Sequence, residues 1–311
     1  MITLPTREFE YSAVITTYQP SQLLRDAINS ILQQSITPKE IILVDDCSKD
    51  LELADIRNLV PEDIVFIFHS NSQNLGAGCS RNIGVGLSST SYIIFFDDDD
   101  VSLPTRSVIH KEAFQNGASV SYVSSRKNYS NGYQVEYPNS EIQPKVLEPK
   151  KLARKLLYGG SYRDSIGDVP SSTLAISKNK FLSIDGFDGS MRRLEDVDLA
   201  IRLSLGLASF SWSSTIAVNR TSTFRQDKGG LVETNHEYIL LQKYGYLIGW
   251  WRKNYAVALI TLRSFYFGGT LAKRKWSSLL GLLNPFCILV LLTRFPRFLS
   301  RLNHDRQQRK K

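Results

Sequence analysis

Cysteine and histidine are both scarce in this chain of 311 residues, and their scarcity removes several kinds of chemistry. The 3 cysteines are too few, and odd in number, for a disulfide framework, and their spacing matches no metal-binding pattern, so we expect a reducing compartment. The 4 histidines are scattered and adjoin none of the motifs described below. Serine and cysteine nucleophile signatures are missing as well. The class of chemistry that remains is carboxylate catalysis assisted by a metal.

Acidic residues are scarce toward one end of the chain. Residues 225–311 contain 16 Lys and Arg but only 4 Asp and Glu, whereas the preceding residues are slightly acidic. Residues 1–11 hold no apolar signal region, so we expect no secretion by that route. This uneven charge predicts that the chain has two parts with different functions, and that the basic part contacts an anionic partner.

Apolar runs are present at residues 13–15, 41–44 and 92–96, and each ends in polar residues. Leu24, Ala27, Ile28 and Ile31 follow the first run at helical spacing. We expect further helices at 51–59 and from Ala77, and a weak strand at 64–68. This strand and helix alternation predicts an α/β fold with a mostly parallel central sheet and helices on both faces. The polar residues at the strand ends should then converge on one crevice.

The second hundred residues are less regular. Residues 105–170 contain many Asn, Ser, Gly and Pro, and we expect loops and an acceptor-side surface there. A strand is expected at 172–177 and a helix at 194–207.

Four aspartates, Asp97–Asp100, follow the third apolar run without a spacer. Four like charges at the end of a buried strand should repel one another and raise one another's pKa. A divalent cation, Mg²⁺ or Mn²⁺, would resolve this conflict. The alternative is a solvated acidic turn, as most acidic runs are.

Two further motifs could serve the same crevice. Asn74–Gly84 is rich in glycine and leads into a helix, and its Arg81 offers a planar donor suited to phosphate. Glu195 and Asp196 open the helix expected at 194–207, and Glu195 shares a helix face with Asp198. The alternative for these acids is a favourable charge in a first helical turn.

These motifs together resemble a family 2 glycosyltransferase with the GT-A fold. The resemblance covers about residues 11–210. It rests on five ordered pieces, namely Val14–Tyr18, Leu43–Ser48, Asn74–Gly84, Phe96–Asp100, and Gly186–Asp188 followed by Glu195–Asp196.

The resemblance implies a role for each matched residue. Thr16 and Tyr18 would line a nucleotide pocket, Asp46 would hydrogen-bond the base, and Arg81 would contact the nucleotide side of the donor. Asp97 and Asp99 would stand at the ends of the Asp-x-Asp motif, with Asp99 the first candidate metal ligand and Asp98 beside the donor. Asp196 would be the general base and Glu195 its orienting neighbour.

The sequence departs from the family pattern in two places. Asp98 and Asp100 add acids to a motif that needs fewer. It therefore stays open which of the four aspartates bind the metal. Thr223–Gly230 holds no histidine where many relatives carry one, and Arg225 or Lys228 is the candidate for the diphosphate there.

The implied activity is inverting transfer of a sugar from a nucleoside-diphosphate sugar, most simply a UDP-sugar, to a hydroxyl acceptor in surface polysaccharide or glycolipid synthesis. The expected cofactor is Mn²⁺ or Mg²⁺. Three alternatives stay open: a haloacid-dehalogenase-type phosphatase with Asp97 as nucleophile, a nucleotidyltransferase, and an inactive membrane-associated binding protein.

The basic end of the chain is also rich in apolar residues. We expect a GT-A catalytic domain at 1–224 and a helical tail at 225–311 that meets the inner face of a membrane through residues 246–301. Residues 276–293 carry no formal charge but are broken by Asn284-Pro285, which favours an in-plane or re-entrant segment over a clean span. The alternative is a helix pair packed on the catalytic domain. Nucleic acid is not expected, because the basic residues flank apolar sequence.

Overall fold

The computed structural model describes residues 9–129, 132–158, 167–221 and 230–267. The chain divides into two compact units, and each is treated by itself below. Residues 1–129, 134–148 and 163–223 belong to the first unit, and the remaining residues belong to the second. The domain boundary expected at residue 224 stays a prediction.

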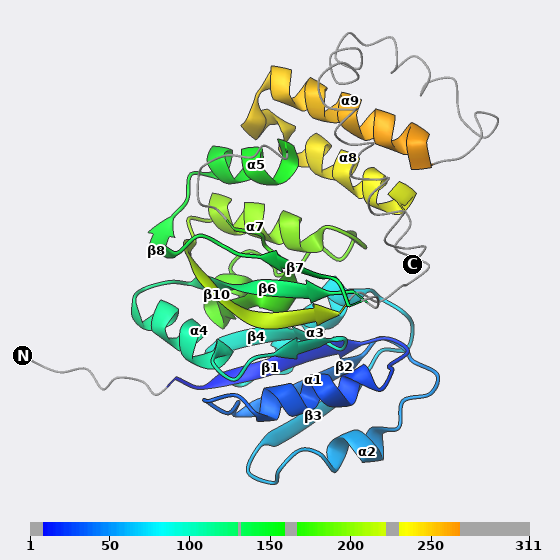
Figure 1. Cartoon of the computed structure of the whole chain (residues 1–311), viewed down its shortest axis with the longest axis vertical. Helices are drawn as coiled ribbons and strands as arrows, with labels where there is room; N and C mark the ends of the chain where they lie inside the picture. The colour runs from blue at the N-terminus through cyan, green and yellow to red at the C-terminus, as the bar shows by residue number, and fades with distance from the viewer. Residues whose placement is uncertain (1–8, 130–131, 159–166, 222–229, 268–311) are drawn as a thin grey trace, which may run out of the picture. The chain divides into compact units, whose positions relative to one another are not determined.

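The first unit is built on one mixed sheet (Figure 1). Its path runs β3-β2-β1-β4-β9-β6-β10-β5, with β7 added to β6 and β8 added to β10. Strands β3, β2, β1 and β4 are parallel, whereas β9 runs antiparallel to both of its neighbours. The α/β class is confirmed, with parallel pairing throughout the half of the sheet nearest the N-terminus. The strands are β1 Tyr11–Thr17, β2 Glu40–Asp45, β3 Val65–Ser70, β4 Tyr92–Asp97, β5 Asp100–Ser102, β6 Val120–Asn128, β7 Gln134–Tyr137, β8 Ile142–Val146, β9 Leu174–Ser177 and β10 Ser209–Thr221.

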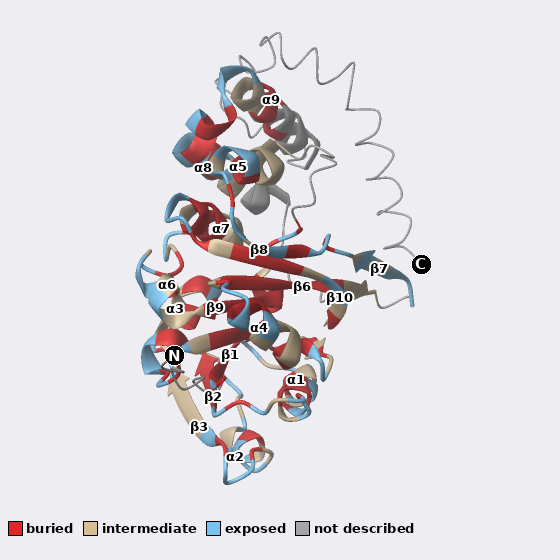
Figure 2. Ribbon diagram, turned by 90° about the vertical axis from the view of Figure 1, so that its left-hand side faces the viewer, coloured by how far each residue is buried: buried red, intermediate tan, exposed pale blue. Residues whose placement is uncertain are grey.

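Helices cover both faces of this sheet, as Figure 2 shows for α1 and α3 on opposite sides. Helix α4 shares the α1 face, because the Ser107 amide donates to Gln34 Oε1 and the Ile36 amide donates to Ser107 Oγ. The expected α1 is confirmed, and its buried residues include the predicted Leu24 and Ile28. The helices are α1 Leu23–Leu32, α2 Leu53–Arg57, α3 Ala77–Leu87, α4 Arg106–Gln115, α6 Lys178–Leu182 and α7 Glu195–Leu205.

The expectation of loops over residues 105–170 is wrong. Helix α4 and strands β6, β7 and β8 all lie in this range, and β6 is a central strand with six consecutive buried residues. Ser, Tyr and Val in Val120–Ser125 alternate too weakly to reveal a strand, because both faces of β6 are covered. Its place in the sheet comes from pairing with distant β9 and β10.

The core on the α1 face joins strands and helices that are far apart in sequence. Every residue of β1 and β2 is buried, as expected of parallel strands covered on both faces. Four aromatic rings close the end of this core, with Tyr92 stacked on Phe114 at 4.5 Å between centroids. Phe9 packs against both of these rings and against Tyr11. At roughly 25 cal/mol per Å² of buried apolar surface, such packing supplies most of the stabilisation of the unit.

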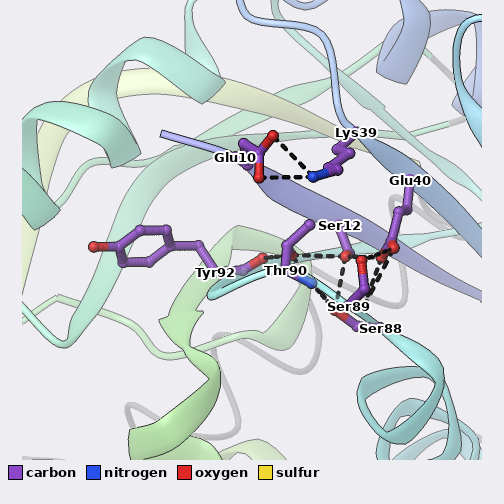
Figure 3. A network of polar contacts seen from close by, with 8 residues as sticks. All are labelled: Glu10, Ser12, Lys39, Glu40, Ser88, Ser89, Thr90 and Tyr92. Carbon is purple, nitrogen blue, oxygen red and sulfur yellow. Dashed lines mark hydrogen bonds and ion pairs between the residues drawn. The ribbon is translucent and has the colours of Figure 1, made fainter. Parts of the chain in front are cut away.

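A buried polar network ties the amino ends of β1 and β2 to the turn before β4 (Figure 3). Ser12 Oγ donates to Glu40 Oε2 at 2.5 Å and also contacts the Ser88 and Thr90 hydroxyls. The Ser89 amide donates to Glu40 Oε2 at 3.0 Å. Glu40 is only 3% exposed, so its carboxylate depends on these donors for the hydrogen bonds that water would otherwise provide. The network fixes the end of the sheet that lies away from the aspartates.

The second unit contains three described helices, α5 Pro149–Tyr158, α8 Gly230–Ile248 and α9 Trp250–Phe267. They pack against one another, and α8 and α9 form a hairpin whose turn is Gly249 at φ +85°. Among the helices that the structure describes, none has the length and apolar character needed to cross a bilayer. The segment expected at 276–293 lies outside the described residues.

Candidate active site

The aspartate run lies at the carboxyl ends of the parallel strands. In the register of the sheet, Asp97 at the end of β4 pairs with Thr16 of β1, and Thr17 pairs with Asp45 of β2. The chain then turns tightly, and Asp100 begins β5. The convergence expected from the sequence is therefore present at this edge.

Three of the four aspartates form a cluster. Carboxylate oxygens of Asp97, Asp99 and Asp100 all lie within 4.8 Å of one another. Asp98 points elsewhere, because it is buried and its Oδ2 accepts a hydrogen bond from Thr17 Oγ1 at 2.6 Å. The turn thus divides the run into a cluster of three and a tether to β1.

The cluster fits a hard divalent cation. Three carboxylates supply oxygen ligands of the kind that Mg²⁺ and Mn²⁺ prefer. Burial and the charges of Asp97 and Asp99 together raise the pKa of Asp100 to about 7. A bound cation would relieve this repulsion. Asp97 and Asp99 were expected as ligands, whereas Asp100 was not assigned.

Arginines of the protein also stabilise the acidic cluster. Arg220 Nε lies 3.9 Å from Asp100 Oδ2, and the Thr221 amide donates to Asp100 Oδ1 at 3.1 Å. Arg106 is buried behind β4, where it donates to the Phe95 carbonyl at 2.8 Å and stacks on the Phe96 ring. Burial lowers the pKa of Arg106 to about 10, so the side chain keeps its charge at neutral pH. Neither arginine could be predicted from the sequence, since both reach the site through tertiary contacts.

Arg81 connects the aspartate cluster to the helix that carries the expected base. Its NH2 group donates to Asp97 Oδ1 at 2.8 Å and its NH1 group donates to Glu195 Oε1 at 3.1 Å. The side chain is 5% exposed and lies over the Phe187 ring. The neighbouring Asp97 and Glu195 carboxylates raise the pKa of Arg81 against the opposing effect of burial. Arg81 is therefore held between two carboxylates in this structure, whereas the sequence suggested a phosphate contact.

The first turn of α7 presents Glu195 and Asp196. Leu194 precedes them at φ +58°, a left-handed conformation that a leucine rarely adopts and that turns the chain sharply into the helix. Asp196 Oδ1 accepts a hydrogen bond from the Val197 amide at 2.8 Å. Burial and the neighbouring Glu195 charge together raise the pKa of Asp196 to about 7. A carboxyl group with such a pKa can accept a proton near neutral pH.

Contacts from α3 fix the approach to α7. Asn82 holds the Phe187 backbone through two hydrogen bonds of 2.8 Å, one to the carbonyl and one from the amide. Gly186 lies at φ +63°, and a Cβ there would lie 2.5 Å from Asn82 Oδ1. Gly78 packs against Phe187 and Glu195, and a larger residue at this position would displace a neighbouring side chain. These contacts show that the Gly186-Phe187 motif packs against the Asn74–Gly84 motif.

The residues expected around the nucleotide lie at the same edge of the sheet. Tyr18 is 37% exposed and Thr16 is nearly buried. Asp46 is also buried, and its carboxylate accepts hydrogen bonds from the Leu75 and Gly76 amides, both at 2.8 Å, and from Asn71 at 2.9 Å. In this structure Asp46 therefore shapes the glycine-rich turn.

Tyr122 is a neighbour of the expected base that the sequence did not reveal. It is fully buried in β6, where its ring stacks on Trp212. Its hydroxyl has no hydrogen-bond partner among the described residues. Burial raises the pKa of Tyr122, and the Asp196 charge raises it further. Arg225 and Lys228, the candidates for the diphosphate, lie outside the described residues.

The fold and this site together define a GT-A-like α/β protein. Solved structures support the fold: that of S. aureus TarS 1–349 in complex with UDP-GlcNAc matches with a TM-score of 0.62 at 17% identity, over 89% of this chain and 79% of that one. The sequence also matches the model of Glycosyl transferase family 2 over residues 12–168. The chain belongs to that family.

Curated relatives agree with the family assignment. A glycosyltransferase of Haemophilus influenzae, described as uncharacterized, is 25% identical over 195 residues, which is 62% of this chain and 61% of that one. A second such protein, from Methanocaldococcus jannaschii, is 28% identical over 193 residues, 61% and 63% of the two chains. An Escherichia coli glycosyl transferase provisionally assigned to colanic acid biosynthesis is 28% identical over 159 residues, 49% and 57% of the two chains. The chain thus spans about three fifths of the length of the relatives that it matches.

Proposed function

We propose that the protein is a metal-dependent inverting glycosyltransferase that moves a sugar from a nucleoside-diphosphate sugar to a hydroxyl group. The observation that carries this proposal is the Arg81 bridge, which joins a carboxylate of the aspartate cluster to the first turn of α7. One site thereby contains a cluster of carboxylates that could hold a cation and, beside it, a carboxyl group of raised pKa. Membership of glycosyl transferase family 2 supports this interpretation over the phosphatase alternative.

In the proposed reaction Asp196 acts as the general base. Its carboxylate takes the proton of the acceptor hydroxyl as that oxygen attacks the anomeric carbon and the bond from this carbon to the diphosphate oxygen breaks. Glu195, held by Arg81, keeps the first turn of α7 in place and supplies the negative charge that raises the pKa of Asp196. The proton ends on Asp196 and the bonding electrons leave with the diphosphate.

The aspartate cluster is the proposed cation site. Asp97, Asp99 and Asp100 would hold Mn²⁺ or Mg²⁺, with Asp99 our first candidate ligand. When bound, the cation supplies positive charge that stabilises the diphosphate leaving group. Asp98, bound to Thr17, fixes the turn between Asp97 and Asp99.

The proposed donor is a UDP-sugar, because a structural neighbour was solved with UDP-GlcNAc. Thr16, Tyr18 and Asp46 are the proposed nucleotide side, and for Asp46 we propose that its hold on the Leu75-Gly76 turn shapes the base pocket. The proposed acceptor is a saccharide or a lipid-linked saccharide in surface polysaccharide or glycolipid synthesis. We further propose a cytoplasmic location at the inner face of a membrane, supported by the basic, aromatic second unit.

A thermal-shift panel of nucleotide sugars, with and without Mn²⁺, tests this proposal. We expect a UDP-sugar to raise the melting temperature only with the metal, and Asp99→Ala to abolish that shift. Asp63→Ala, which removes an exposed aspartate from the turn before β3, is the matched control and should behave as wild type. A metal-dependent shift retained by Asp99→Ala would refute the cation site. Failure of every nucleotide sugar in the panel to bind would refute the proposed function.

A further inference from the structure

The turn between α8 and α9 exposes an unusual group of aromatic side chains. Trp250 is 64% exposed, Trp251 is 70% exposed and Tyr246 is 68% exposed. The two indole rings meet edge to face, 5.0 Å apart at their centroids. Tryptophan is mostly buried in globular proteins, so two adjacent exposed ones indicate a surface with a partner. We name Tyr246, Trp250 and Trp251 the aromatic tip.

The buried residues of the hairpin are not those of the aromatic tip. Its inner side is filled by other residues, among them Leu240, Leu241, Leu247, Ile248 and Tyr255, all of which are buried. Gly249 turns the chain at φ +85° and so directs the end of α8 into the start of α9. The three aromatic residues therefore stay on the outside of a well-packed helix pair.

Basic residues lie close to the aromatic tip in the sequence. The stem of Lys253 crosses α8 at Gly245, where an added Cβ would lie 2.7 Å from Lys253 Cδ. Lys243 and Arg252 lie on the same two helices, close to the turn in sequence. From Tyr238 to Phe267 the chain contains no Asp or Glu. The sequence of the hairpin around the aromatic tip therefore carries only positive formal charges.

We propose that the aromatic tip is a membrane anchor that inserts into the headgroup region of a bilayer containing anionic lipids. Tyrosine and tryptophan favour this region because each has an apolar body and a polar atom that stays hydrated. Lysine and arginine beside them attract anionic headgroups. A purely apolar protein partner would not favour the positive charge, and a glycan would not require it. The inference rests on the proposed function in one respect, namely that an acceptor on the membrane makes such an anchor useful.

Vesicle sedimentation of the full chain tests the anchor. We expect binding to phosphatidylcholine vesicles that contain about 30% phosphatidylglycerol, and weak binding to phosphatidylcholine alone. Trp250→Ser/Trp251→Ser should reduce binding to the anionic vesicles by about tenfold or more. Leu182→Ser, which removes an exposed leucine from α6 in the first unit, is the matched control and should change nothing. Unchanged binding of the tryptophan variant to the anionic vesicles would overturn the proposal. So would a tryptophan variant that loses binding to a soluble protein or glycan but keeps its binding to the vesicles.

A second measurement locates the tryptophans directly. In a Trp276→Phe background, brominated lipids should quench Trp250 and Trp251, whereas buried Trp212 stays unquenched. Absence of quenching would overturn the proposal even if the double variant misfolds. Asp196→Asn separates the two hypotheses: it should bind vesicles as wild type does. Vesicle binding without binding of any nucleotide sugar would count against the proposed function alone.

Discussion

Replacing Arg81 by methionine should weaken both the stability of the first unit and the activity. The substitution keeps most of the apolar stem but leaves Asp97 and Glu195 without their shared cation. Breaking a buried ion pair costs about 3–5 kcal/mol. Because the partners are 29% and 15% exposed in their side chains, we reduce this to about 2–4 kcal/mol.

A double-mutant cycle isolates the Arg81–Glu195 pair from these wider effects. Arg81→Met, Glu195→Gln and the double variant should give a coupling energy of about 1–2 kcal/mol, since contacting residues of one network are not additive. Urea unfolding followed by Trp212 fluorescence reports on the first unit, in a background where the other three tryptophans are phenylalanine. EDTA keeps divalent metal from compensating the loss.

The exposed Arg126–Glu136 pair between β6 and β7 is the matched control. Its atoms are 2.8 Å apart, close to the Arg81 distances, yet its side chains are 36% and 54% exposed. Its cycle should therefore give at most about 0.5 kcal/mol. Equal coupling in the two cycles would refute the argument that burial makes Arg81 a structural link. Arg81→Lys should also lose transfer activity, because one ammonium group cannot bridge both carboxylates in the planar geometry of a guanidinium.

Three further predictions concern pH and the buried polar groups. Asp196 must be ionised to accept a proton and its pKa is about 7, so kcat/KM should rise with pH up to about 7 and then level. Asp196→Asn should remove transfer activity while binding of the donor persists. Glu40→Ala should cost about 2–4 kcal/mol in urea unfolding by leaving the buried Ser12 hydroxyl and the Ser89 amide without their acceptor, and a loss below 1 kcal/mol would contradict this. Burial and the charge of Arg106 hold the pKa of His110 well below its usual value, so the unfolded chain binds this proton first. The contribution of His110 to stability, measured as the difference between wild type and His110→Gln, should therefore fall by up to about 2 kcal/mol from pH 7 to 5.

The half of the sheet that precedes residue 100 could be predicted from local pattern. Its strands are continuous apolar runs and α1 is amphipathic, so type and order follow from side-chain periodicity. The part after residue 105 could not, because β6 takes its place between β9 and β10 through pairing partners at least about fifty residues away. Local sequence carries little information on such contacts.

For the site, the sequence by itself determined which carboxylates gather at the strand ends. The apolar run at 92–96 predicted a strand that ends at Asp97–Asp100, and the apolar spacing after residue 194 predicted a helix that opens with Glu195-Asp196. Only the tertiary structure decided which of these carboxylates form the cluster and which make other contacts. A tight turn sends Asp98 to Thr17 and brings Asp100 into the cluster with Asp97 and Asp99.

The four aspartates predicted a nearby counter-charge, for which the sequence suggested a divalent cation. The structure adds Arg81, Arg106 and Arg220, which reach the cluster from α3, α4 and β10. Their contribution depends on distance and burial, since charges interact strongly only when they are close and shielded from water. Sequence order fixes neither distance nor burial, and so the electrostatics of this site were decided by the fold.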